Sequence, residues 1–246
     1  MLNRRTSLSI AVSIALATSL MACGGSDHVP SATLEVTPAL GAAYGASVTV
    51  FNGTTGATLG SGITGATSGT ASIPLIGSTS GPIVVKVTLT PGSSYFDEKL
   101  NSTVTITSVN TVSLLTALPA LPTSTVKSVG VTPLTNMAAK LAGLDPASAN
   151  VIVSADKATE GAAKTVLALG LPATFNITAA PIAAKSLTTL PNDLYGLLLA
   201  EMAKRAPVNA LNQAKDLAGC GNTERKKWGI APQQRVVEPE FHHLEI

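Results

Sequence analysis

The chain has 246 residues, a formal net charge of +2, and only 12% charged and 3% aromatic residues. A globular protein usually carries about 25% charged residues, and no basic stripe stands out here, so the composition argues against a nucleic-acid partner. The region after the N-terminus contains no unbroken apolar run of about 18 residues, so we expect no membrane-spanning helix.

The first 22 residues have the layout of a secretory signal peptide. Arg4 and Arg5 form a short positive patch, and residues 8–21 are uncharged and mostly apolar. This apolar run is too short to cross a hydrocarbon core of ~30 Å, and its order after a positive patch is typical of export signals. The alternatives are a buried core helix and twin-arginine export, although the "TSLS" that follows the arginines fits the second poorly.

The apolar run ends at Leu20-Met21-Ala22-Cys23, which resembles the lipobox of bacterial lipoproteins. The resemblance implies cleavage between Ala22 and Cys23, then a diacylglycerol on the Cys23 sulfur and an acyl chain on its amine. Stable anchoring needs more than one such chain, since each buried CH₂ contributes only about 0.8 kcal/mol. An ordinary signal peptide with a chance cysteine is the alternative.

The residue after the cysteine, Gly24, bears on the location. In lipoproteins of diderm bacteria an Asp at this position retains the protein in the inner membrane, so the resemblance implies a lipid anchor in the outer membrane. We therefore expect one partner, the membrane itself, with any protein or glycan partner unknown. Residues 23–30 are small and polar and are interpreted as a flexible tether. If Cys23 is lipidated, Cys220 has no disulfide partner within the chain.

Residues 31–118 show the two-residue alternation of half-buried strands. The clearest examples are "ATLEVTP" from Ala32 and "IVVKVTL" from Ile83, and "ASVTVFNG", "TASIPL" and "STVTITSVNTVSLLT" continue the pattern. Glycine-rich turns separate the runs; Asn52-Gly53 is typical of a tight hairpin, and Pro74 predicts an edge or bulged strand. Six or seven short strands of this kind predict an antiparallel β-sandwich.

The glycine-punctuated order of these strands resembles a known module. The stretch "GASVTVFNGTTGATLGSGITGATSGTASIPL", followed by "GPIVVKVT" and "SSYFDE", is similar to the carboxypeptidase-regulatory-like, transthyretin-like β-sandwich. The similarity covers less than half of the chain. It implies a structural or binding module and brings no catalytic residues.

Residues 119–131 are interpreted as a Pro/Ser/Thr connector and 132–219 as a small helical domain. Thr132 as N-cap, Pro133 in the first turn and Gly143 after the last turn predict one helix. Asp145-Pro146 predicts the start of a second, longer helix that ends near Leu169. The segment "VTPLTNMAAKLAG" resembles uncharacterised proteobacterial lipoproteins, which provide no activity to transfer. The predicted fold class is α+β by separate domains, an antiparallel β-sandwich followed by a small helical domain.

Two further helices are predicted in the "PNDLYGLLLAEMAKRA" and "VNALNQAKDLAG" segments, and the second ends at Gly219. Their apolar positions recur at helical spacing: Leu194, Leu198 and Met202 in the first, and Leu211, Ala214, Leu217 and Ala218 in the second. We expect some of this apolar surface to lack partners.

Catalytic motifs are scarce. No histidine occurs between residues 29 and 219, which removes a Ser-His-Asp triad and an H-E-x-x-H zinc site from this region. Ser124–Lys127 and Ser154–Lys157 match S-x-x-K, but the S-D-N and K-T-G partners of that chemistry are missing, and chance matches are expected in a serine-rich chain.

The remaining candidates are pairs of charged or imidazole side chains. Asp97-Glu98 is interpreted as a solvated strand end rather than a metal-binding pair, with Tyr95 and Phe96 as packing residues. Lys204-Arg205 is interpreted as the basic last turn of a helix, and His242-His243 as a poor metal site because no third ligand is evident. We expect no metal, no cofactor and no catalytic residues.

Residues 220–246 differ from the rest of the chain, with eight charged residues in 27 and the single tryptophan, Trp228. They are interpreted as an atypical tail, either disordered or translated out of frame. The sequence as a whole favours a lipid-anchored cell-envelope protein of binding, adhesion or structural type. The alternative is an envelope hydrolase with a Ser-Lys or carboxylate site.

Overall fold

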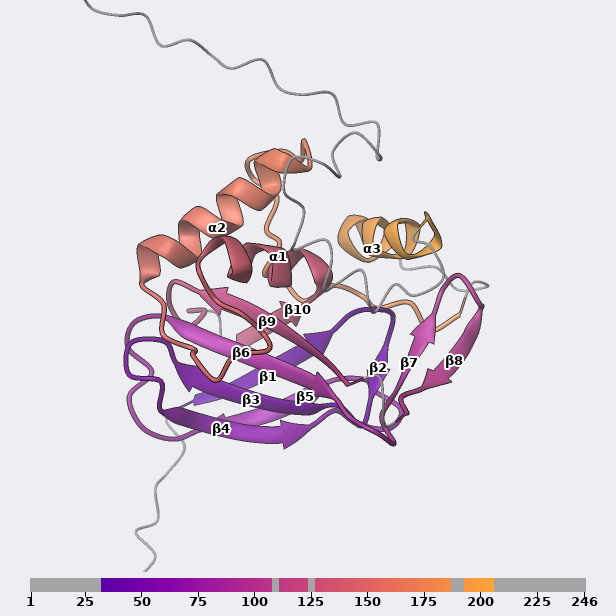
Figure 1. Ribbon diagram of the computed structural model, residues 1–246, viewed down its shortest axis with the longest axis horizontal. Helices are drawn as coiled ribbons and strands as arrows, with labels where there is room; N and C mark the ends of the chain where they lie inside the picture. The colour runs from indigo at the N-terminus through magenta and orange to yellow at the C-terminus, as the bar shows by residue number, and fades with distance from the viewer. Residues whose placement is uncertain (1–31, 108–110, 124–126, 187–192, 206–246) are drawn as a thin grey trace, which may run out of the picture.

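The computed structural model describes residues 32–107, 111–123, 127–186 and 193–205, and these residues form ten strands and three helices (Figure 1). The predicted signal peptide, Cys23, the tether, Ser124, Trp228 and His242-His243 lie outside the described residues. The strands are β1 Ala32–Pro38, β2 Ala43–Tyr44, β3 Ser47–Asn52, β4 Thr58–Ile63, β5 Ala71–Leu75, β6 Ile83–Leu89, β7 Ser94–Asp97, β8 Ser102–Thr105, β9 Val112–Leu118 and β10 Lys127–Val131. The helices are α1 Pro133–Leu141, α2 Ala155–Ala168 and α3 Leu194–Arg205.

The described strands form three sheets, in the orders β10-β1-β5, β4-β3-β6-β9 and β2-β7-β8. Every pairing is antiparallel except that of β1 with β10, which is parallel. The coarse prediction of antiparallel sheets together with helices is therefore confirmed. Pro74 lies in β5, which is an edge strand of its sheet, as predicted.

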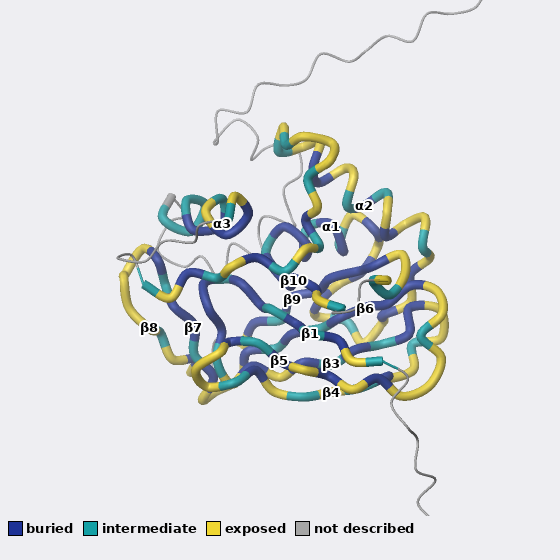
Figure 2. Tube along the Cα trace, turned by 180° about the vertical axis from the view of Figure 1, so that it is seen from behind, coloured by how far each residue is buried: buried dark blue, intermediate teal, exposed yellow. Residues whose placement is uncertain are grey.

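The main hydrophobic core lies between the first two sheets. The alternate residues of the strands point into it and are almost completely buried, which is the dark blue centre of Figure 2. These core residues include Leu34 and Val36 of β1, Val48 and Val50 of β3, Ile73 of β5, and Val85 and Val87 of β6. The period-two pattern thus placed the right residues on the inner faces of a sandwich.

The helices pack both on the sheet and on one another. Val84 of β6 and Leu115 of β9 point away from the sandwich core and are buried in one cluster with Ala139 of α1 and Val153. In Figure 1, α1 and α2 accordingly lie over the sheet that contains β6 and β9. The separate helical domain stays a prediction, because the described helices share one buried cluster with the sheet and another among themselves. The consecutive apolar residues in "IVV" and "SLLTAL" are typical of strands buried on both faces.

The expected connector is also partly a strand. Its last five residues form β10, which pairs with β1 from Leu34–Lys127 to Pro38–Val131. Sequence periodicity carries no information about which distant strand is the neighbour, so this parallel pairing was not foreseen. Because β10 runs directly into α1, the pairing fixes where that helix begins.

The ends of α1 were predicted correctly. Thr132 is the N-cap, and the hydroxyl groups of Thr132 and Thr135 each accept from the other residue's backbone N–H in a capping box. The helix ends at Leu141, and Gly143 follows with a φ of 94°. Leu141, the last residue of the helix, is 46% exposed.

The start of α2 was predicted too early. Asp145 instead caps a turn by accepting from the N–H of Ala147, and Val151 and Val153 lie buried against the sheet. The N-cap is Ser154, whose hydroxyl accepts from the Lys157 N–H at 3.2 Å. Within α2, Gly161 allows close contact with α1, because a Cβ there would lie 2.3 Å from the Ala138 carbonyl oxygen.

The Asn52-Gly53 pair does not form a two-residue turn. The Asn52 side chain accepts from the N–H groups of Thr54 and Thr55, and the positive φ of 75° falls at Gly56. The side chain of Asn52 therefore organises a longer loop between β3 and β4, as Asn commonly does by binding the backbone two residues on.

The edge strand β9 is completed by side chains of α1. The Leu115 N–H donates to Oδ1 of Asn136 at 3.0 Å, and the Thr135 hydroxyl donates to the Leu115 carbonyl oxygen at 3.1 Å. The Thr116 hydroxyl lies 2.7 Å from both Thr135 Oγ1 and the Gly130 carbonyl oxygen. Two side chains thus supply a donor and an acceptor where a neighbouring strand would otherwise pair.

We predict that Asn136→Ala lowers the free energy of unfolding by about 1–3 kcal/mol, because it leaves the buried Leu115 N–H without its acceptor. Asn150→Ala is the matched control, since Asn150 accepts from Ile152 in an exposed loop and substitutions at such positions usually change stability by about 0.5 kcal/mol or less. Urea denaturation measures both. Equal stability of the two variants would contradict this role for Asn136.

Candidate binding groove and a buried carboxyl

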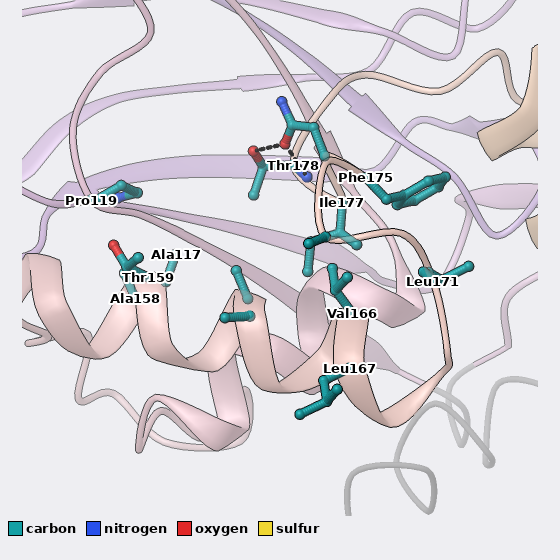
Figure 3. Close-up of a pocket in the computed structure, with 14 residues that line it drawn as sticks. Ala117, Pro119, Ala158, Thr159, Val166, Leu167, Leu171, Phe175, Ile177 and Thr178 are labelled. Carbon is teal, nitrogen blue, oxygen red and sulfur yellow. Dashed lines mark hydrogen bonds between the residues drawn. The ribbon is translucent and has the colours of Figure 1, made fainter. Parts of the chain in front are cut away.

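A groove with a cavity volume of about 380 Å³ lies between α2, residues 171–178 and the end of β9 (Figure 3). Its base is formed by the small side chains on one face of α2, among them Ala158 and Ala162. Its lining residues are Ala117, Pro119, Ala158, Thr159, Ala162, Ala163, Val166, Leu167, Leu171, Ala173, Phe175, Asn176, Ile177 and Thr178.

The outer wall of the groove is held in place from behind by α3 and β10. The Tyr195 hydroxyl lies 2.7 Å from the Ile177 carbonyl oxygen and 2.7 Å from Thr132 Oγ1. The rings of Phe175 and Tyr195 meet edge to face with centroids 5.3 Å apart. The Gly130 N–H donates to the Thr178 carbonyl oxygen at 2.9 Å. The wall is therefore part of the folded body rather than a free loop.

The groove has no titratable side chain in its lining. The side-chain oxygen of Asn176 is already hydrogen-bonded within its own loop, since Oδ1 accepts from both the N–H and the hydroxyl of Thr178 (Figure 3). Leu167, which lines the groove, is 61% exposed. This arrangement suits the burial of an apolar group, and its lining provides no group for acid–base or nucleophilic chemistry.

A second feature is the carboxyl of Glu98, just after β7. Glu98 was expected at a solvated strand end, but it is only 2% exposed, and its Oε2 has no hydrogen-bond partner among the described residues. Burial raises the pKa of Glu98 from 4.5 to about 8; its own backbone N–H and Lys204 lower it, and Asp97 raises it. Glu98 lies two residues after buried Phe96 and shares its alternation phase, which is the one local signal from which burial could have been inferred.

Asp97 and Glu98 do not converge on one site. Asp97 Oδ1 accepts from the N–H groups of Lys99 and Leu100, and its Oδ2 lies 3.3 Å from the Tyr95 hydroxyl. Tyr95 and Phe96 are buried, in agreement with a packing role. In the described part of the chain no three His, Cys, Asp or Glu side chains gather as metal ligands.

Of the two S-x-x-K matches, Ser154–Lys157 lies within the described residues, and it forms the start of a helix. The Ser154 hydroxyl caps α2, while Nζ of Lys157 lies 2.8 Å from Glu160, on the exposed side of the helix. Lys157 is thus engaged by a carboxylate rather than placed on the serine oxygen. The serine of the other match, Ser124, lies outside the described residues. Lys204 is in the last turn of α3, as predicted, and pairs with Glu201 at 2.9 Å.

The comparisons with known proteins give no match: no family model fits the chain, and no curated protein or solved structure is significantly similar to it. In the ranges that the structure describes, no helix has the length and hydrophobicity required to cross a bilayer. The groove and Glu98 must therefore be interpreted from their own geometry.

We predict that the protein loses stability as the pH rises from about 4.5 to about 8, because the unfolded chain ionises Glu98 at the lower value and the folded chain at the higher one. The folded state binds more protons over this window, so its stability falls by up to about 1.4 kcal/mol per pH unit. Glu98→Gln should flatten this decline in thermal or urea unfolding measured at pH 4.5, 6 and 8.

The control is Glu160→Gln. Two lysine side chains lower the pKa of Glu160 to about 2, so this carboxyl is ionised in both states over most of the window, and its removal should leave the Glu98-dependent decline in place. A slope that is the same in the wild type and Glu98→Gln would show that Glu98 does not retain its proton on folding.

Proposed function

We propose that this chain is a lipid-anchored protein of the cell envelope that binds a partner and performs no catalysis. The anchoring rests on the lipobox-like Leu20-Met21-Ala22-Cys23, which follows a positive patch and a short apolar run. Gly24 in place of Asp favours the outer membrane.

The binding part of the proposal rests on the groove beside α2. Its volume of about 380 Å³ is within the usual range of ligand sites, which are mostly apolar with a few polar groups. A largely aliphatic lining with one aromatic ring, Phe175, and no charge suits an acyl chain. The hydrolase alternative gains no support from the described residues, since Ser154 caps a helix and Glu98 is enclosed.

Cys23→Ser should move the protein from the membrane fraction to the soluble fraction, because the sulfur that would carry the diacylglycerol is gone. The measurement is fractionation of cells after a high-salt wash, with immunodetection. Cys220→Ser is the control and should stay with the membrane. Retention of Cys23→Ser in the washed membranes would contradict lipid anchoring through this residue.

Ala163→Phe should weaken the binding of a fluorescent fatty acid by about tenfold or more, since a large side chain would occupy the groove and remove roughly 1.4 kcal/mol or more of binding free energy. Ala163 lines the groove and is exposed, so the folded body tolerates the larger side chain. Ala168→Phe, on an exposed position of the same helix outside the groove, should bind as the wild type does. Equal affinity in the two variants, or no saturable binding by the wild type, would refute the groove as an acyl-chain site.

A further inference from the structure

One side of α3 carries apolar side chains that the described body does not cover. Leu194 is 71% exposed and Leu197 is 37% exposed, and residues three apart on a helix share a face. Ile182, 52% exposed, lies at the same end, because its N–H donates to Asp193 just before the helix. We call Ile182, Leu194 and Leu197 the outer face of α3.

The opposite side of α3 is attached to the body. Tyr195 and Leu199 are buried in the cluster that includes Leu134 of α1, and Ala200 packs on Phe96 of β7. Of the three apolar positions at helical spacing, Leu198 and Met202 pack against this cluster, whereas Leu194 points outward. The described residues cover α3 on one side only, and its outer face is left for another segment or molecule.

The chain that continues from α3 is suited to this face. The helix ends at Arg205, and Ala206-Pro207 follows, where the proline disfavours continuation of the helix. Beyond it, Leu211, Ala214, Leu217 and Ala218 recur at helical spacing up to Gly219. Twelve residues from 208 to 219 would span about 18 Å as a helix, which equals the span of the twelve residues of α3.

We propose that residues 208–219 fold back as a helix antiparallel to α3 and cover its outer face. A short connection makes consecutive helices antiparallel neighbours. With the reversal at residues 206–207, position 218 lies opposite Leu194 and position 214 opposite Leu197 and Leu198. The apolar positions of the segment then meet the exposed end of α3, while Asn212 and Asp216 point to solvent.

The outer face fits an intramolecular segment better than a second copy of the chain. It consists of three apolar side chains at one end of a helix, whereas a stable protein–protein interface buries about 800 Å² on each partner. A segment that begins directly after Arg205 is present at an effective concentration of the order of millimolar, so a small contact suffices to hold it.

Disulfide cross-linking of the full chain tests this arrangement, with Cys23→Ser and Cys220→Ser removing both native thiols. In that background, Leu194→Cys with Ala218→Cys should give an intramolecular disulfide under mild oxidation, seen as a mobility shift on non-reducing electrophoresis. The control pair, Leu194→Cys with Leu211→Cys, joins positions at opposite ends of the two helices and should stay reduced.

A further substitution separates packing from chance encounter. Leu217→Asp places a charge in the contact and should abolish the cross-link of the 194–218 pair, whereas Asn212→Asp on the solvent side should leave it intact. Three results would overturn the proposal: equal cross-linking of both cysteine pairs, no cross-link in either, or a disulfide between two chains, which would assign the face to a second copy. Circular dichroism confirms that each variant is folded.

Discussion

The hydrogen bonds between α1 and the edge of β9 determine where the helices lie on the sheet. An edge strand presents N–H and C=O groups that must be paired or covered, and Asn136 and Thr135 meet this requirement at Leu115. Because the contact is directional, it fixes the position and rotation of α1 on the sheet. Close contact between Gly161 and Ala138 then positions α2, and the Thr132–Tyr195 hydrogen bond positions α3. The groove, which lies between elements positioned in this way, is a consequence of the same contact.

The segment "VTPLTN" can be understood in these terms. Val131 ends the parallel strand, Pro133 fits the first turn, and each threonine side chain takes part in hydrogen bonds that neither valine nor alanine could make. The hydroxyl groups lie in a region with almost no solvent exposure, where an unpaired polar group is costly. The segment therefore specifies one position of α1 on the sheet, and the hydrogen bonds of its side chains serve the architecture of the fold rather than catalysis.

Local patterns predicted the parts of the fold that depend on neighbouring residues. The strand alternation and the Thr132-Pro133 helix start were recognisable because their causes, side-chain direction and capping, act within a few residues. The pairing of β10 with β1, the burial of Glu98 and the groove depend on segments far apart in the chain. Glu98 looked solvent-exposed because its own segment is polar, but distant parts of the chain lie near its carboxyl, among them Gly41 and Lys204 of α3. The groove went unnoticed because alanines on α2 carry no chemical signature of their own.

The parallel pairing of β1 also affects how the folded body resists a pulling force. β1 is the first described strand and lies between β5 and β10, hydrogen-bonded on both edges. A force applied to the chain at Ala32 along the strand would act across both ladders at once, so that many hydrogen bonds share the load and must break together. A peripheral hairpin at this position would instead open one bond at a time. The body is thus connected to whatever precedes it through a strand that is hydrogen-bonded on both of its edges.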